Sequence, residues 1–153
     1  MLALLLLCPL PAKAASSAAI RAYDDVDIAT KNFAGKSLIQ AEFNDAKLEG
    51  ANFSSADLRG AVFNGSNLKR ANFHGADFSD GIAYITNFAE ANFTDAVLTS
   101  AMLLQSNFKD ADITGADFTF AVLDRAQLLA LCQRASGTNP TTGVDTRESL
   151  ECR

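Results

Sequence analysis

Residues 51–80 read ANFSSADLRGAVFNGSNLKRANFHGADFSD, which is six consecutive five-residue units of one design. The third residue of each unit is large and apolar, and the first is small. The same phase holds over residues 31–130, where nineteen of twenty third positions are Phe, Leu or Ile and fourteen of twenty first positions are Ala. The exception among the third positions is Ala83. A fixed internal period of this kind predicts a repeat architecture.

A period of five matches neither an amphipathic helix nor a plain strand. In an α-helix the large residues would rotate by about 140° at each step and would spread round the cylinder. In a continuous strand they would alternate between opposite faces, because five is odd. A solenoid that turns one corner per unit points every third residue inward. The pattern therefore predicts an all-β solenoid with an axial core of Phe and Leu.

Four units carry a resemblance to a known family: Ala51-Asn-Phe-Ser-Ser, Ala56-Asp-Leu-Arg-Gly, Ala71-Asn-Phe-His-Gly and Ala91-Asn-Phe-Thr-Asp. They resemble the A-(D/N)-(L/F)-X-X repeat of pentapeptide-repeat proteins. The resemblance covers residues 31–130 and implies a right-handed quadrilateral β-helix with four units per coil, about five coils long. Residues twenty apart would then stack in columns along the axis.

The length of 153 residues predicts one domain with a linear core, in which neighbouring coils bury one another and both ends need caps. We expect a targeting-peptide remnant at 1–14, an N-terminal cap at 15–25, the β-helix at 26–130 and a helical C-terminal cap with a disulfide at 124–153.

The N-terminus begins Met1-Leu-Ala-Leu-Leu-Leu-Leu-Cys-Pro-Leu, and Ala12-Lys-Ala14 follows. An apolar run of this length before a small-residue motif is typical of a signal peptide and is too short to span a membrane. The alternative is a buried apolar helix. Cleavage after Ala14 would change the net charge from −5 to −6 and leave no membrane segment.

The C-terminal part has helical composition from Asp124 to Gly137, and Asp145-Thr-Arg-Glu148 fits a capping box that opens a short helix to Cys152. Cys132 and Cys152 would be the two cysteines left after cleavage, and an even count in an exported chain favours a disulfide. Such a bond would stabilise the fold by about 3 kcal/mol in the chain-entropy model. The alternative is two reduced, structural thiols.

Little in the sequence indicates chemistry. His74 is the only histidine, at an outward position, and we interpret it as a solvated side chain. Asp57, Asp77 and Asp117 share one face and are interpreted as a solvated wall rather than a cation site. Scattered basic residues and a negative charge argue against nucleic acid as a ligand. We therefore predict no catalytic, cofactor or metal residues.

The columns show one regular feature and one departure. Asn32, Asn52, Asn72, Asn92 and Asp112 form a column whose amides can hydrogen-bond along the axis. Another outward column is apolar where its sister columns are polar. We call this face the apolar wall, and its members are Val62, Ile82, Tyr84, Ile85, Met102, Leu104 and Val122.

An exposed apolar surface of this kind predicts either a covering element or a protein partner. The covering candidates are residues 20–23 and the C-terminal cap. Ala83 lies behind the same wall and would leave a void costing a few kcal/mol unless it is filled. We expect Tyr84 or Ile82 to turn inward, or the coil to narrow or bulge.

The segment from Ala135 to Cys152 resembles the tail of the thylakoid-lumen pentapeptide-repeat proteins of plants and cyanobacteria. The resemblance implies a chloroplast or cyanobacterial lumenal location, with the import route, Tat or Sec, left open. The prediction is a monomeric, non-enzymatic scaffold that binds an unidentified lumenal protein. The alternatives are a DNA-mimicking topoisomerase-binding protein, as some members of the family are, and an enzyme.

Overall fold

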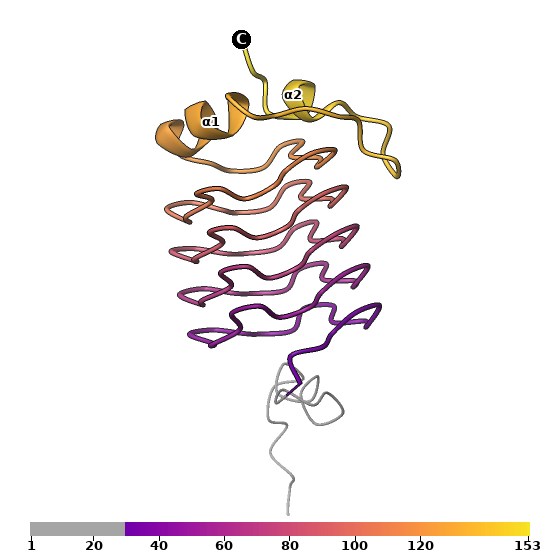
Figure 1. Cartoon of the computed structure of the whole chain (residues 1–153), viewed down its shortest axis with the longest axis vertical. Coiled ribbons are helices and arrows are strands. Elements are labelled where there is room, and N and C mark those ends of the chain that lie inside the picture. The colour runs from indigo at the N-terminus through magenta and orange to yellow at the C-terminus, as the bar shows by residue number, and fades with distance from the viewer. Residues whose placement is uncertain (1–29) are drawn as a thin grey trace, which may run out of the picture.

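The computed structural model describes residues 30–153, which form a stack of coils with a helical cap across one end (Figure 1). Each coil is joined to the next by parallel bridges between residues twenty apart, from Asn32↔Asn52 to Met102↔Val122. The helices are α1 (Arg125–Cys132) and α2 (Thr146–Ser149). Five residues per face and twenty per coil give four faces, as predicted.

A single bridging residue on each face holds neighbouring coils together. Phe53 N–H donates to Asn72 O at 2.7 Å, and Asn72 N–H donates to Ala51 O at 2.8 Å. The turn between faces closes with a bond such as Ala56 N–H to Phe53 O at 3.0 Å. The fifth residue of most units has positive φ, for example 67° at Gly60. Because the turn recurs every five residues, no face grows into a longer strand.

The core is a set of stacked rings along the axis. Phe33, Phe53, Phe73 and Phe93 lie above one another, with successive ring centroids 4.6, 5.1 and 4.8 Å apart. Phe43 and Phe63 stack in the same way at 4.8 Å, and rings of neighbouring columns meet edge to face. Offset-stacked and edge-to-face pairs are the favoured aromatic geometries. The inward period of the sequence is therefore also the period of the core.

Behind Ala83 the structure differs from our expectation. Tyr84 is 42% exposed, and Ile82 stays outward and keeps its bridges to Val62 and Met102. The ladder between coils continues through this position, so the coil does not bulge there. Instead, the ring of Phe78 lies 5.6 Å from that of Phe63 and fills the space. Phe78 stands in the column of Leu38, Leu58, Leu98 and Phe118, and Ala83 stands in the column of Phe43, Phe63, Leu103 and Leu123, so this coil is larger than most in the first column and smaller in the second.

Gly81 completes this arrangement. It replaces the usual Ala, and a Cβ at Gly81 would come within 2.2 Å of the Phe78 ring. The three substitutions, Phe78, Gly81 and Ala83, therefore form one packing unit. The compensation that we expected from Tyr84 or Ile82 comes instead from Phe78, on the preceding face of the same coil.

Two ladders of asparagine side chains run along the outside. In the predicted column, Asn52 Nδ2 donates to Asn32 Oδ1 at 3.3 Å, and the same contact recurs from Asn72 and from Asn92. A second ladder, which we did not predict, joins Asn67, Asn87 and Asn107 at 3.2 Å per step. Each ladder satisfies amides that would otherwise compete for backbone groups.

The cap begins where the chain leaves the coil. Asp124 and Gln127 form a capping box at the start of α1, and Asp145 accepts from Arg147 and Glu148 at the start of α2. Both helices end earlier than predicted, at Cys132 rather than near Gly137 and at Ser149 rather than Cys152. Cys132 and Cys152 are joined by a disulfide with a Cα–Cα distance of 5.6 Å.

The cap supplies hydrogen-bond partners to every face of the last coil. Gln127 Nε2 donates to Leu103 O and Ser106 O at 2.7 Å, and Arg134 donates to Phe108 O. Gly115 N–H donates to Ser136 O at 2.8 Å, and Phe118 N–H donates to Ser149 Oγ at 3.0 Å. These contacts cover part of an edge that would otherwise be open to pairing with another chain.

Candidate interaction surface

The apolar wall lies on one face of successive coils. Val62, Ile82, Met102 and Val122 are bridged to one another in order, so they form a continuous vertical column. Tyr84, Ile85 and Leu104 lie beside that column on the same units. Of the seven, Tyr84, Ile85, Met102 and Val122 are 42–55% exposed, and the other three are half-buried. The structure therefore brings all seven predicted residues together.

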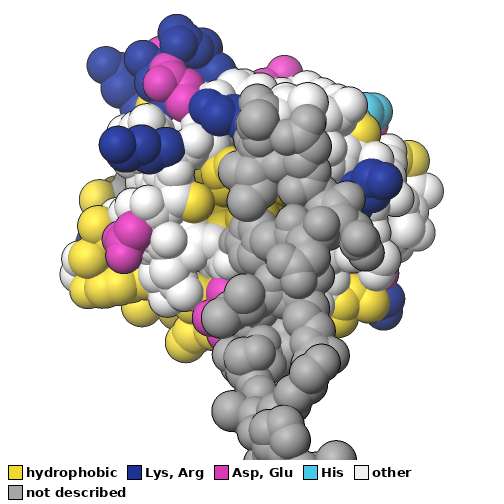
Figure 2. Space-filling model, turned by 90° about the horizontal axis from the view of Figure 1, so that it is seen from below, with side chains coloured by type: hydrophobic (Ala, Val, Ile, Leu, Met, Phe, Trp, Pro, Cys, Tyr) yellow, Lys and Arg dark blue, Asp and Glu magenta, His cyan; other side chains and the backbone are white. Residues whose placement is uncertain are grey.

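Neighbouring polar groups hold the wall in place. Tyr84 N–H donates to Asn64 Oδ1 at 2.9 Å, and Tyr84 Oη donates to Gln105 Oε1 at 3.2 Å. Phe120, two residues before Val122, is 78% exposed and extends the apolar character to the adjoining corner. Seen along the solenoid from below, the largest group of hydrophobic side chains lies at the lower left of the outline, and smaller groups lie along its right side (Figure 2).

A column of buried hydroxyls follows the wall at the next corner, where most units have Ala. Thr86 Oγ1 donates to Phe63 O at 2.8 Å, and Thr86 N–H donates to Ser106 Oγ at 2.9 Å. Ser66 and Ser106 donate to Phe43 O and Ala83 O in the same manner. We did not single out this column, although the change from Ala to Ser or Thr at 66, 86 and 106 was a visible signal.

Ile85 has an unfavourable backbone for its residue type. Its φ is 54°, in the left-handed region, and its side chain is 55% exposed. A β-branched residue there is an outlier, because its Cβ crowds the following carbonyl. The residue below it in the column is Gly65, which accepts this conformation without strain. The cost of this conformation is not offset by burial, because most of the Ile85 side chain is exposed.

The cap does not cover the wall. α1 and α2 lie across the end of the stack, and Met102 and Val122 remain 47% and 42% exposed beside it (Figure 1). The other covering candidate, residues 20–23, lies outside the described residues. Within residues 30–153, the wall is therefore a solvent-facing surface.

The other residues singled out from the sequence have structural partners. Asp57 binds Arg59 through both carboxylate oxygens, at 2.8 and 2.6 Å, and this hydrogen bonding holds the pKa of the Asp57 carboxyl below its ordinary value. Asp77 and Asp117 accept from Ser79 and Thr119 in their own turns. Among residues 30–153, no three His, Cys, Asp or Glu side chains gather as a metal site would require, and no helix is long and apolar enough to cross a membrane.

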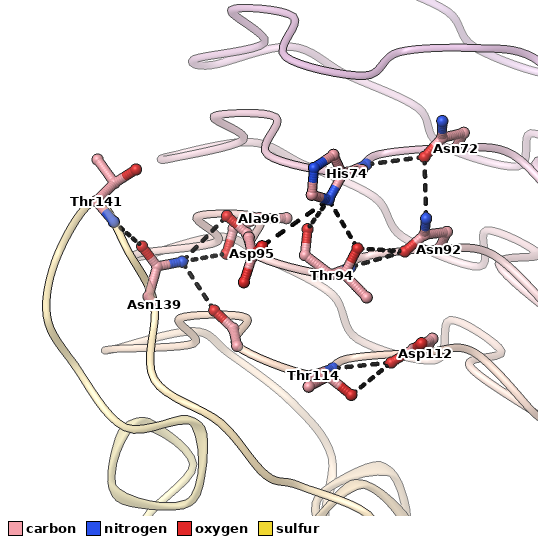
Figure 3. A network of polar contacts seen from close by, with 11 residues as sticks. Asn72, His74, Asn92, Thr94, Asp95, Ala96, Asp112, Thr114, Asn139 and Thr141 are labelled. Carbon is pink, nitrogen blue, oxygen red and sulfur yellow. Dashed lines mark hydrogen bonds and ion pairs between the residues drawn. The ribbon is translucent and has the colours of Figure 1, made fainter.

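His74 lies in a side-chain network that also includes the cap (Figure 3). Its Nδ1 is 2.8 Å from Thr94 Oγ1 and 4.0 Å from Asp95 Oδ2. The neighbouring Asn139 is fully buried, and its Nδ2 donates to the carbonyls of Asp95, Ala96 and Gly115 at 2.9–3.1 Å. Asn139 thus anchors the C-terminal loop to two coils, a role that local sequence patterns do not reveal.

A comparison with known protein families shows to which family the chain belongs. A model of pentapeptide repeats matches residues 41–80 and 91–128 in eight copies. The chain belongs to the pentapeptide-repeat family. This family assignment confirms the predicted right-handed quadrilateral β-helix.

Two relatives of this pentapeptide-repeat protein come from the thylakoid lumen of Arabidopsis thaliana. Thylakoid lumenal protein TL20.3 is 64% identical over 31 residues, which are 20% of this chain and 11% of that protein. A solved pentapeptide repeat protein of the lumen is 32% identical, with 80% of this chain and 90% of that chain covered and a TM-score of 0.46. A plasmid-mediated fluoroquinolone resistance protein is 21% identical, with 67% and 84% covered and a TM-score of 0.40.

Proposed function

We propose that this pentapeptide-repeat protein is a non-enzymatic scaffold of the thylakoid lumen that binds a protein partner through its apolar wall. The observation that carries the proposal is the wall itself, a continuous apolar column on a solenoid whose other faces are mostly polar. The column is half-buried at Val62 and Ile82 and exposed at Met102 and Val122. Large apolar patches on soluble proteins typically mark interaction sites. The strained Ile85 at its centre supports a functional rather than a structural reason for the patch.

The location in the lumen rests on the relatives and on the two ends of the sequence. The relative that covers most of this chain is a lumenal protein, and the N-terminal residues have the composition of an export signal. The disulfide between Cys132 and Cys152 fits a compartment in which thiols are oxidised. A scaffold role fits a solenoid whose described polar side chains bond mainly to their own turns and to the coils above and below.

The proposal is tested by retrieving partners from thylakoid lumen with the wild-type protein and with the double variant Ile82→Asp/Met102→Asp. The matched control is Val97→Asp, because Val97 is also an outward apolar residue but belongs to the column of Asp57, Asp77 and Asp117. We expect the double variant to lose partners that the wild type and the control retain. Retention of the same partners by a folded double variant, judged by circular dichroism, would refute the proposal.

A further inference from the structure

A second surface lies at the cap, between α1 and the last coil, and is independent of the apolar wall. It is a cleft of about 300 Å³. One side is the face formed by residues 106–110, and the other is formed by Gln127, Ala130, Leu131 and Arg134. We call it the cap cleft. It exists because the chain turns into α1 at Arg125 instead of laying a further unit over residues 106–110.

The coil below shows what such a face normally binds. Phe88 N–H donates to Asn107 O and Glu90 N–H donates to Lys109 O, both at 2.8 Å. Each face thus offers two N–H donors, two residues apart, to an extended segment stacked on it. One coil higher, the equivalent donors are the N–H groups of Phe108 and Asp110, and they have no acceptor among residues 30–153.

The carbonyls of the same face are already occupied. Ser106 O accepts from Gln127 and Phe108 O accepts from Arg134, so side chains of the cap replace part of the missing coil. The replacement is incomplete because Gln127 and Arg134 supply donors, whereas the unmet groups of this edge are donors themselves. A ligand must therefore bring acceptors with the spacing of alternate carbonyls in an extended chain.

Lys109, Asp110 and Arg134 are the charged residues that line the cleft, so its two cations outnumber its one carboxylate. Lys109 and Arg134 form no ion pair within residues 30–153, and the buried Nε of Arg134 has no hydrogen-bond partner there. Lys69, two coils below Lys109, pairs with Glu90 at 3.1 Å, twenty-one residues further on. The same step from Lys109 reaches Ala130, which lines the cleft and carries no charge. The register thus leaves Lys109 without the acidic partner that Lys69 has.

We propose that the cap cleft binds an extended, acidic peptide segment of a partner protein by strand addition. The peptide carbonyls accept from Phe108 and Asp110 N–H, an apolar side chain contacts the exposed Ala130, and an acidic side chain pairs with Lys109. This is edge pairing of the kind that extended peptides make with exposed sheet edges.

The probe for the test is the acetylated and amidated peptide Thr-Asn-Phe-Ala-Glu, the sequence of residues 86–90, because that backbone already stacks on this type of face. It is titrated into the full-length protein labelled with ¹⁵N, and a peptide with Lys in place of Glu serves as the charge control. We expect the amide signals of Phe108 and Asp110 to shift, with the Glu peptide binding about three- to tenfold more tightly.

Two test variants and one control variant keep the test independent of folding. Lys109→Glu changes an exposed side chain and should reverse the preference between the two peptides, while Lys47→Glu makes the same charge change three coils away and should not. Ala130→Trp should fill the cleft and abolish the shifts. The proposal is overturned if the Phe108 and Asp110 amides do not move at millimolar peptide, or if Lys109→Glu leaves the preference unchanged.

Discussion

At the scale of single residues, one member of the apolar wall, Ile85, has a strained backbone with positive φ. Ile85 adopts a left-handed backbone that most of its counterparts in other units achieve with Gly, Asp or another unbranched residue. The left-handed conformation costs an L-residue about 1–2 kcal/mol, and glycine avoids this at the expense of chain entropy. The wall is therefore expected to lower stability and to favour binding.

Ile85→Gly should consequently raise the free energy of unfolding by about 0.5–1 kcal/mol while weakening partner binding. Chemical denaturation measures the first effect and partner retrieval the second. Gln105→Gly, in the same column and also at positive φ, is the control for removing a side chain without β-branching. A loss of stability in Ile85→Gly that exceeds that of the control would show that Ile85 is not strained.

Gly81 is a second residue of interest, because the ring of Phe78 leaves no room for a side chain there. Gly81→Ala should destabilise the protein by about 1–3 kcal/mol, because its Cβ would overlap the Phe78 ring. Adding Phe78→Leu and Ala83→Phe restores the common pattern of the other coils and should recover the loss. Denaturation of the single and triple variants measures both. Additive destabilisation in the triple variant would contradict the proposed packing unit.

At the scale of elements, the cap is fastened by polar anchors more than by helix packing. α1 has eight residues and α2 has four, so neither helix would be stable alone. Asn139 fastens the loop between them. The two hydrogens of its Nδ2 are shared among the carbonyls of Asp95, Ala96 and Gly115, and its Oδ1 accepts from the N–H groups of Thr141 and Thr142. The disulfide then ties the end of α1 to the C-terminal residues.

Asn139→Asp should therefore lower the free energy of opening of the cap by about 2–3 kcal/mol at neutral pH, because a carboxylate cannot donate to the backbone carbonyls around it. A protonated carboxyl can donate, so the folded pKa of this Asp should be raised and the destabilisation should shrink as the pH falls toward that pKa. Hydrogen exchange of residues 136–150 measures the effect. Asn139→Ala should show no such recovery, and equal pH dependence of the two variants would contradict this role.

At the scale of the whole molecule, the periodic part of the fold could be predicted from the sequence and its exceptions could not. The inward phase of Phe and Leu, the stacking interval of twenty and the positions of the wall residues all follow from one register. The pairing of a large Phe78 with a small Ala83 could not be predicted from one column, because it couples two columns across the core. Gly81 has to be considered together with both residues. Asn139 was missed because its partners lie twenty-four or more residues earlier in the chain.

The wall and the cap cleft divide the surface into two separate sites. The wall follows the long axis and presents side chains, whereas the cleft lies at the cap and presents backbone donors. A scaffold with two such sites can hold an apolar surface and an extended segment of one partner, or bring two partners together. Their variants are distinguishable, because Ile82 and Met102 lie on a different face from Lys109.

The central claim, that the apolar wall is the surface in contact with a partner, is tested most directly by site-specific photocrosslinking in intact thylakoid lumen. A photoreactive residue replaces Met102 in one protein and Val97 in another, so that the two probes sit on different faces of the same solenoid. We predict a discrete crosslinked species from position 102 and none from position 97. Equal crosslinking from both positions, or from position 97 alone, would contradict the claim.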